Sequence, residues 1–559
     1  MKKTVEHIIP NIEDWPISQF GEKRGDFVAD LNAFVLKEIV ENHGSDLEPL
    51  LAKTIYLEKR RSKNNKWKVD PEDEERYWSS LGSELNDITQ SGGDQAKYKD
   101  LLKRVINRYD EEIVGTFKPK TFKFTYKILN VIFKRLLNTA AGRNHRRLWG
   151  NKHQLVEKVK VYGEIDKLKS LFDKGTVVIV PTHFSNLDSM VIGYAMHAAV
   201  GIPAFSFGAG LNLFDNEIVG YFINRLGAYR VDRRKKNPIY LECLTSMAAY
   251  SIQKGINNLF FPGGTRSRNG GMEDRLKLGL LGSSIEAQRN MVIDGQKEKV
   301  FIVPMILGYN FVLEAKFLIE QHLAKTGKEK YIKSKDAFKS YRKITKFIWS
   351  LFSEKSDLSI SFGEPMDILG NIVDENGVSY DTNGEHIDLK DYFSLDGEIK
   401  ANPQRENVYT KILGDRILDS YKRNNVMLTS HLVAYAAFKI LERGYDGDVY
   451  SLVNLPKEKA QIDYDYFVSI VGEMQEVLLQ WEIDGKIKMS PETKWDPERI
   501  IKDGIKNLGI YHVQKPLVQK NEKVWSEGLK VLYYYHNRIK IYELDKFIEW
   551  SASSSVQNA

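Results

Sequence analysis

The chain has 559 residues, of which 42% are hydrophobic and 28% are charged, a balance typical of globular proteins and not of disordered chains. One hydrophobic core rarely supports this length, so two or three domains are expected. The formal net charge of +7 favours anionic partners but is small for a nucleic-acid-binding protein. The single cysteine, Cys243, excludes an internal disulfide and a cysteine-based metal site.

The first segment, residues 1–117, is predicted to be mainly helical. Apolar residues recur every three or four positions in 27–44 and in 97–115, which places them on one helical face. We expect this region to be a scaffold. Its opening residues, MKKTVEHIIPNIEDWP, contain no apolar run of seven, so they are not expected to be a secretion signal.

Residues 118–147 differ in composition, because they contain nine Lys or Arg residues and no acidic residue. The apolar positions of 128–137 fall on one helical face with basic residues beside it. Two interpretations are open. The segment is either a basic amphipathic helix lying on an anionic membrane or a helix packed on the core with its lysines in solvent.

Between 165 and about 312, short apolar segments alternate with helical patterns, as in proteins whose helices cover a parallel sheet. The predicted strands are 176–180, 203–207, 226–231, 257–261 and 300–307. The fold class is therefore α/β, with a mixed, largely parallel sheet flanked by helices and with helical N- and C-terminal regions.

One uncharged stretch, residues 189–214, is long enough to span a bilayer. It is interrupted by glycines and by Pro203, so a buried helix, a turn and a buried strand explain it better. Beyond the sheet region, residues 369–404 are rich in Asp, Gly and Asn and are predicted as a polar loop. Residues 405–550 are predicted to be mainly helical, and 551–559 to be a disordered tail.

The segment VVIVPTHFSNLDS (177–189) carries the first candidate for catalysis. An apolar strand ends, and His183 follows where a helix should begin, with Asp188 five residues later. Imidazole at the end of a strand can act as a general base, and a neighbouring carboxylate can fix its tautomer. The same spacing occurs in His386 and Asp391, but no strand precedes that pair, so it is interpreted as a coincidence.

Three later segments add arginines and glycines at strand ends. They are GAYRVDRR (227–234), LFFPGGTRSRNGG (259–271) and VFIVPMILGYN (300–310), the last with Pro304 inside its strand. Backbone N–H groups at glycines and guanidinium groups together form phosphate sites. Each segment alone is more often structural, but their order behind a strand-borne His–Asp pair is specific.

In this order the four segments resemble the blocks of the glycerol-phosphate acyltransferase superfamily. Those blocks are a His-x-x-x-x-Asp motif, a Gly-to-Arg strand, an F-P-E-G-T-R-S loop and an apolar segment with proline. Segments 306–321, 360–368 and 532–538 look like the larger branch that acts on glycerol 3-phosphate and dihydroxyacetone phosphate. The resemblance covers about 118–368, which predicts an acyltransferase domain in that range.

The resemblance implies a peripheral membrane enzyme on the cytoplasmic face. It would move a fatty acyl group from acyl-CoA or acyl carrier protein to a hydroxyl of glycerol 3-phosphate or a related acceptor in phospholipid biosynthesis. Dihydroxyacetone phosphate and lysophosphatidate also present a hydroxyl near a phosphate, so the acceptor stays open. No metal, cofactor, covalent acyl-enzyme or nucleic-acid partner is implied.

The resemblance also implies residue roles. His183 would deprotonate the acceptor hydroxyl, and Asp188 would orient His183. Pro304 would shape the acyl-donor side. The acceptor phosphate would be held by Arg233, Gly264, Thr265, Arg266 and Ser267.

One position departs from the superfamily pattern. Gly263 stands where the third block has glutamate, a residue that would help hold the glycerol part of the acceptor. Glu273 or Asp274, just downstream, is a candidate to replace that carboxylate. The departure keeps open a non-catalytic lipid-binding relative.

A further alternative is a hydrolase, because AFSFG (204–208) approximates a nucleophile elbow with Ser206 at its centre. An elbow needs a helix directly afterwards, and the following GAGLN is poor helix material.

Overall fold

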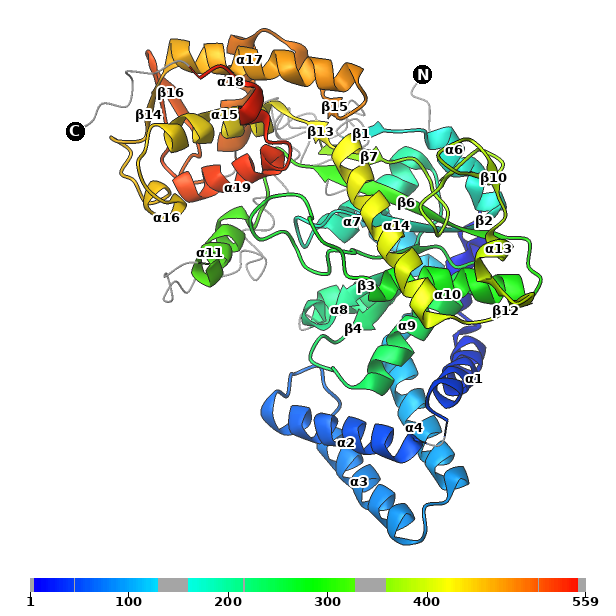
Figure 1. Cartoon of the computed structure of the whole chain (residues 1–559). Helices are drawn as coiled ribbons and strands as arrows, with labels where there is room; N and C mark the ends of the chain where they lie inside the picture. Colours follow the sequence, from blue (N-terminus) through cyan, green and yellow to red (C-terminus); the bar gives the residue numbers. More distant parts are fainter. Residues whose placement is uncertain are drawn as a thin grey trace.

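The computed structural model describes residues 5–44, 46–128, 159–214, 217–326, 358–510 and 512–550. Within the basic segment predicted at 118–147, residues 119–128 are helical, and residues 129–147 lie outside the described residues. The predicted tail, 551–559, also lies outside them. Figure 1 shows the N-terminal helices and the C-terminal helices at different ends of a central α/β region.

Four helices make up most of the N-terminal segment, which confirms its predicted helical character. They are α1 (Arg24–His43), α2 (Leu47–Asn64), α3 (Glu74–Gln90) and α4 (Gln95–Ile113). Their apolar stripes share one core with α9 (Pro238–Gln253), where Leu31, Leu101 and Met247 are all buried. The N-terminal region is therefore packed directly onto the central α/β region.

The centre of the molecule is a seven-stranded mixed sheet in the order β1-β7-β6-β2-β5-β3-β4. The strands are β1 (Val159–Tyr162), β2 (Gly175–Pro181), β3 (Ser206–Gly210), β4 (Ala228–Val231), β5 (Asn258–Leu259), β6 (Lys299–Gly308) and β7 (Leu358–Phe362). Five strands are mutually parallel, and β1 and β7 run the opposite way. The predicted mixed, largely parallel sheet is confirmed.

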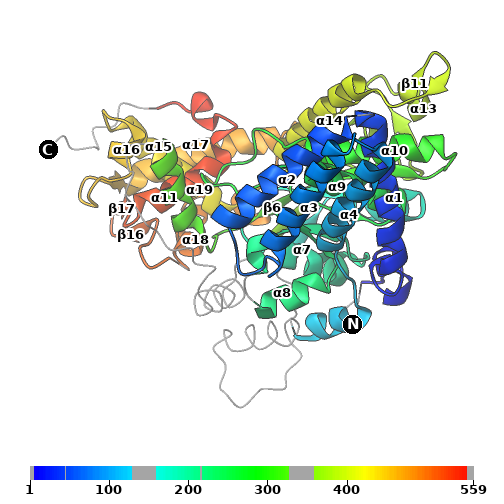
Figure 2. The same cartoon turned by 90° about the horizontal axis from the view of Figure 1, so that it is seen from below.

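Both faces of this sheet are covered, which explains why β2 is a continuous apolar run. Val178 and Val180 face the core beneath α9, α10 (Gly279–Ile293) and α14 (Pro403–Asn424). Val177 and Ile179 belong to the opposite core, which includes α7 (Asp188–Ala195) and the C-terminal helices. Figures 1 and 2 show α14 and α10 lying side by side along one flank.

Two strand predictions need correction. β3 begins at Ser206 and not at 203, because the chain first turns through Gly201, which has a φ of 79°. β5 contains only Asn258 and Leu259, and the chain then leaves the ladder toward the glycine-rich loop. Both differences concern where a strand begins or ends, which local patterns fix poorly.

Pro304 lies inside β6, although proline cannot donate to a strand ladder. It sits opposite Val180 of β2, next to the point where β7 ends at Phe362. The N–H of Gly363 donates to the Pro304 carbonyl at 2.8 Å as the chain leaves the sheet.

The predicted polar loop at 369–404 is wrong as a loop, because much of this segment is ordered in short elements. Strands β8 (Ile372–Val373), β9 (Ser379–Tyr380) and β10 (His386–Ile387) form an antiparallel sheet. It is followed by α13 (Leu389–Phe393) and the pair β11 (Ser394–Leu395) and β12 (Glu398–Ile399).

The composition of this segment reflects tight turns. Asp374 accepts hydrogen bonds from the backbone of Asn376 and Val378, and Asp381 repeats the pattern one turn later. The Asp, Asn and Gly residues are therefore those that hairpin turns require.

The C-terminal region is helical, as predicted. Its larger helices are α15 (Thr429–Arg443), α17 (Tyr464–Ile483), α18 (Pro497–Gly509) and α19 (Leu529–Lys540). Nearly every side chain of α15 is buried beneath the other three. In the part of the chain that the structure describes, no helix is both long and apolar enough to cross a membrane.

Candidate active site

The His–Asp pair predicted from the sequence is formed at the end of the central strand. β2 ends at Pro181, and α7 begins at Asp188, which brings the carboxylate back to the strand end. His183 Nδ1 lies 2.8 Å from Asp188 Oδ2. The His183 side chain is 15% exposed and that of Asp188 is fully buried, so only the imidazole is accessible.

Asp188 is held on both of its oxygens. Oδ2 also accepts the backbone N–H groups of Phe184 at 2.7 Å and Ser185 at 2.9 Å. The Tyr309 hydroxyl donates to Oδ1 at 2.7 Å. An acceptor held this firmly favours the imidazole tautomer with its proton on Nδ1.

That tautomer leaves Nε2 of His183 as a proton acceptor. Nε2 forms no hydrogen bond with any residue in the described part of the chain. The ring stacks on Phe261 with centroids 4.0 Å apart and planes 24° apart, which limits its rotation. An oriented imidazole with a free Nε2 has the geometry of a general base.

The glycine-rich loop predicted from the third block reaches the same strand end. The N–H of Ser267 donates to the His183 carbonyl at 2.8 Å. The Ser267 hydroxyl donates to the Gly271 carbonyl at 2.7 Å, a hydrogen bond within the glycine-rich loop itself. Thr265 is exposed, and Gly264 has a φ of 72°, a backbone conformation that favours glycine.

Arg266 is tied to this strand end by a residue without an expected role, Glu314. The Glu314 carboxylate is buried and lies 3.1 Å from Arg266. It also accepts the Ser185 hydroxyl at 2.9 Å and the Asn186 N–H at 3.0 Å. Burial raises the pKa of Glu314, against the lowering effect of Arg266. Glu314 thus joins the third-block loop to the His–Asp turn.

Arg233 and Arg266 bring two positive charges near each other. Partial desolvation by the surrounding protein lowers the pKa of the Arg233 guanidinium, and the like charge of Arg266 lowers it further. Arg233 forms no hydrogen bond or ion pair with a residue that the structure describes. Two guanidinium groups of which one lacks a partner suit a dianionic phosphate.

The neighbouring Arg234 is used differently. Its guanidinium binds Asp232 and the carboxylate of Asp70, with N–O distances of 2.7 and 2.5 Å. It also lies over the Trp67 ring at 4.3 Å. Asp70 and Trp67 belong to the connection between α2 and α3, so the N-terminal region fixes the loop that carries Arg233.

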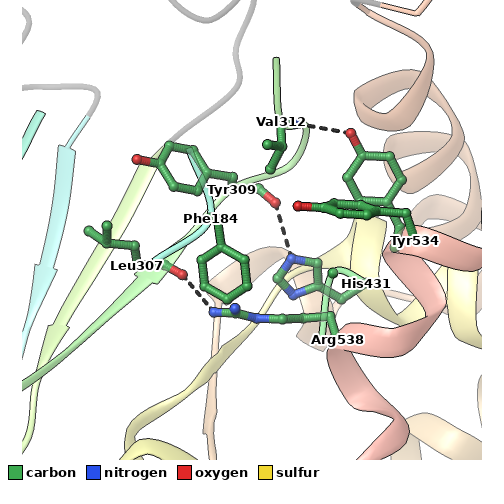
Figure 3. A pocket seen from close by; sticks show the side chains of 9 residues that line it. Phe184, Leu307, Tyr309, Val312, His431, Tyr534 and Arg538 are labelled. Carbon is green, nitrogen blue, oxygen red and sulfur yellow. Dashed lines mark hydrogen bonds between the residues drawn. The ribbon is translucent and has the colours of Figure 1, made fainter. Parts of the chain in front are cut away.

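The C-terminal helices contribute a wall of polar side chains next to Phe184, the residue after His183 (Figure 3). A cavity of about 20 Å³ is lined by Phe184 and Tyr309 and by three residues of α15 and α19: His431, Tyr534 and Arg538. This volume suits roughly one water molecule. Three buried polar atoms around it lack a partner within the described residues: His431 Nδ1, Tyr534 Oη and Arg538 Nε.

Arg538 anchors this wall to the sheet. Its Nη2 donates to the Leu307 carbonyl at 2.6 Å, and its guanidinium lies 4.1 Å from the Phe184 ring centroid. Burial lowers the pKa of Arg538 to about 10, and burial with the Arg538 charge lowers that of His431 to about 3. His431 is therefore neutral, and Arg538 is charged near neutral pH.

Three other sequence candidates form no hydrogen bond with the His–Asp pair in the described part of the chain. Pro304 packs beside Gly363, on the core face toward α14. Ser206 is fully buried within β3, and its hydroxyl donates to the Gly227 carbonyl at 3.2 Å, so no nucleophile elbow exists there. His386 in β10 and Asp391 in α13 are both exposed, and neither element belongs to the seven-stranded sheet.

The fold and the site together define a class of protein. Its features are a mixed sheet with a His–Asp pair at the end of the central strand and Gly- and Arg-bearing loops that follow neighbouring strands. Residues 158–308 match the family model described as Acyltransferase.

Curated glycerol-3-phosphate acyltransferases are similar to a larger part of the chain. The one from Alteromonas mediterranea is 24% identical over 353 residues, 61% of this chain and 38% of the relative. The one from Shewanella sp. strain ANA-3 is 24% identical over 443 residues, which are 75% of this chain and 47% of the relative. The one from Pasteurella multocida is 26% identical over 298 residues, which are 52% of this chain and 34% of the relative.

Residues 158–308 are thus similar to the Acyltransferase family, and the relatives that match a larger part of the chain are named glycerol-3-phosphate acyltransferases. The matches span less than half the length of each of these relatives.

Proposed function

We propose that the protein transfers a fatty acyl group from acyl-CoA or acyl carrier protein to a hydroxyl of glycerol 3-phosphate, in phospholipid biosynthesis. The observation that carries the proposal is the orientation of His183. Its Nδ1 is bound to the buried Asp188 at 2.8 Å, and its carbonyl is bound by Ser267, the residue after Arg266, whose charge lies near Arg233. The names of the similar proteins favour glycerol 3-phosphate over the other acceptors.

In the proposed reaction, the acceptor phosphate binds to Arg233 and Arg266, and one hydroxyl meets His183 Nε2. His183 takes the hydroxyl proton as the oxygen attacks the thioester carbonyl. The tetrahedral intermediate then expels the thiolate, which takes the proton from His183, so no net proton is lost. Holding both substrates in register supplies much of the rate, and Asp188 stabilises the transient imidazolium.

The test is acyl transfer by purified protein in mixed micelles. A labelled long-chain acyl-CoA or acyl carrier protein is offered with glycerol 3-phosphate, dihydroxyacetone phosphate, lysophosphatidate or water. We expect transfer to glycerol 3-phosphate, abolished in His183→Ala and unchanged in His386→Ala, which removes the other histidine with the same spacing. Transfer only to lysophosphatidate would correct the acceptor. Full turnover by His183→Ala would contradict the mechanism, and no turnover by folded wild-type protein would favour a lipid-binding relative.

A further inference from the structure

The backbone of His183 is held by a second carboxylate, that of Glu273. Glu273 follows the glycine-rich loop, and its Oε1 accepts the His183 N–H at 2.9 Å. The His183 carbonyl is bound by the same loop through Ser267. Both backbone groups of the histidine therefore depend on residues 267–273 and not on a regular strand ladder.

The Glu273 carboxylate lies in a closed and charged environment. Its Oε2 is buried and lacks a partner among the residues that the structure describes. Burial raises the pKa of Glu273, against the lowering effects of the His183 backbone bond and the nearby charge of Arg538. Arg538 in turn lies against Phe184, the residue after His183. The Arg538 charge therefore acts on the Glu273 carboxylate through space, without an ion pair between the two groups among the described residues.

Gly263 makes this placement possible. A Cβ atom at position 263 would lie 2.9 Å from Glu273 Cγ and 3.3 Å from Glu273 Oε1. A side chain at 263 would therefore occupy the space that the Glu273 carboxylate fills. Positions 263 and 273 compete for one location beside His183, and this chain fills it from 273. The other downstream candidate, Asp274, is exposed.

We infer that Glu273 is a positioning residue for acyl transfer: from position 273 it supplies the carboxylate that fixes the His183 backbone, in a space that Gly263 leaves clear. By holding the backbone, Glu273 sets where Nε2 of His183 meets the acceptor hydroxyl. This inference rests on the proposed function, because it concerns the same histidine.

The test compares four variants with wild type. Glu273→Ala removes the carboxylate, and Glu273→Gln keeps an oxygen that can accept the His183 N–H. The double variant Gly263→Glu/Glu273→Ala moves the carboxylate to the competing position. Asp274→Ala is the matched control, an exposed carboxylate one residue along. Each is assayed for kcat, for KM of acyl-CoA and glycerol 3-phosphate, and for Tm.

We expect Glu273→Ala to lower kcat about 10²-fold, because a displacement near 1 Å of a catalytic group has that effect, with both KM values within about twofold. Glu273→Gln should retain most of the rate, and the double variant should recover at least about tenfold over Glu273→Ala. Asp274→Ala should match wild type. A wild-type kcat in Glu273→Ala would overturn the inference. So would a kcat as low as that of Glu273→Ala in both Glu273→Gln and the double variant.

A measurement independent of turnover separates this inference from the proposed function. Diethyl pyrocarbonate modifies neutral imidazole, and mass spectrometry quantifies its reaction at His183. A released backbone should make His183 of Glu273→Ala react several-fold faster than wild type, with the wild-type rate restored in the double variant. If wild type transfers no acyl group, the proposed function fails while this labelling still judges Glu273. Equal labelling rates in wild type and Glu273→Ala would overturn the positioning role.

Discussion

At the scale of single residues, the arginines near the site differ in whether a carboxylate of the protein already binds them. Arg233 and Arg234 are adjacent in the sequence, yet Arg234 binds Asp70 and Asp232 while Arg233 has no partner among the described residues. Arg266 is already paired with Glu314. Arg233 is therefore the arginine whose removal should affect a bound phosphate with the least effect on the fold.

We expect Arg233→Ala to raise the KM for glycerol 3-phosphate by roughly 10- to 100-fold, since a hydrogen bond to a charged group contributes about 1.5–3 kcal/mol. The kcat value and Tm should change little. Steady-state kinetics with varied acceptor, together with thermal unfolding, measure both. Lys236→Ala, an exposed cation three residues along, is the control. An unchanged acceptor KM would remove Arg233 from the phosphate site.

At the scale of elements, the connection between α2 and α3 supports the Arg233 loop. Asp70 and Arg234 are both almost fully buried, and Asp70 also lies 3.4 Å from Arg61. Removing one partner of a buried ion pair leaves an uncompensated charge and typically costs about 3–5 kcal/mol. The N-terminal helices thus contribute to the site through an ion pair and not through contact with His183.

From this contact we expect Asp70→Ala to lower Tm by several degrees and to raise the acceptor KM several-fold. The KM for acyl-CoA should stay near the wild-type value, because the affected loop carries Arg233. Glu41→Gln, which breaks the exposed pair with Lys37, should leave both properties unchanged. If Asp70→Ala lost stability while its acceptor KM stayed constant, the two regions would be coupled in folding only.

A second element-scale prediction concerns α10. Burial and the nearby charge of Glu38 raise the pKa of Glu286 to about 8. The pKa of an unfolded Glu is near 4.3, so unfolding lets Glu286 ionise and stability falls as pH rises from about 5 to 8. Glu286→Gln removes the ionisable group, so this fall in stability with rising pH should disappear. Its Tm should exceed that of wild type by about 2 °C at pH 8 and by less at pH 5.

Differential scanning calorimetry at both pH values tests this expectation. Glu375→Gln, at an exposed acid, is the control and should show no pH-dependent difference. A Tm difference of Glu286→Gln that is equal at pH 5 and pH 8 would contradict a titrating Glu286.

At the scale of the whole molecule, we predict that the protein binds anionic membranes peripherally through the start of the basic segment. Lys118, Lys120, Lys123 and Lys127 are exposed around residues 119–128, and Phe124 beside them is 53% exposed. Each lysine near an anionic surface contributes about 1 kcal/mol. Replacing all four with Gln should weaken binding strongly, by roughly fivefold per lysine.

Sedimentation with phosphatidylserine-containing and with phosphatidylcholine vesicles measures this binding. Only the anionic vesicles should bind wild type, and high salt should release it. The control replaces four exposed lysines of the N-terminal helices: Lys53, Lys63, Lys97 and Lys103. Equal binding by the two quadruple variants would favour the alternative that the segment packs on the core with solvated lysines.

The sequence by itself determined the α/β class, the central strand and the His183–Asp188 pair. These features are local: an apolar run shows a buried strand, and a five-residue spacing returns Asp188 to the strand end through one turn. The order of the Gly- and Arg-bearing segments also pointed to the superfamily. By contrast, the hairpin turns of 369–404 have the composition of a loop, so composition alone misjudged them.

Only the tertiary structure decided which residues surround the pair. Glu314 lies 131 positions beyond His183 and Arg538 lies 355 beyond it, and no local pattern links them, since such contacts depend on how β6 and α19 pack. The same holds for the choice between Glu273 and Asp274. Adjacent acids look equivalent in sequence, but packing buries the carboxylate of the first next to Gly263 and leaves the second in solvent. Spacing along the chain fixes local geometry, whereas burial and long-range contacts arise only when the chain folds.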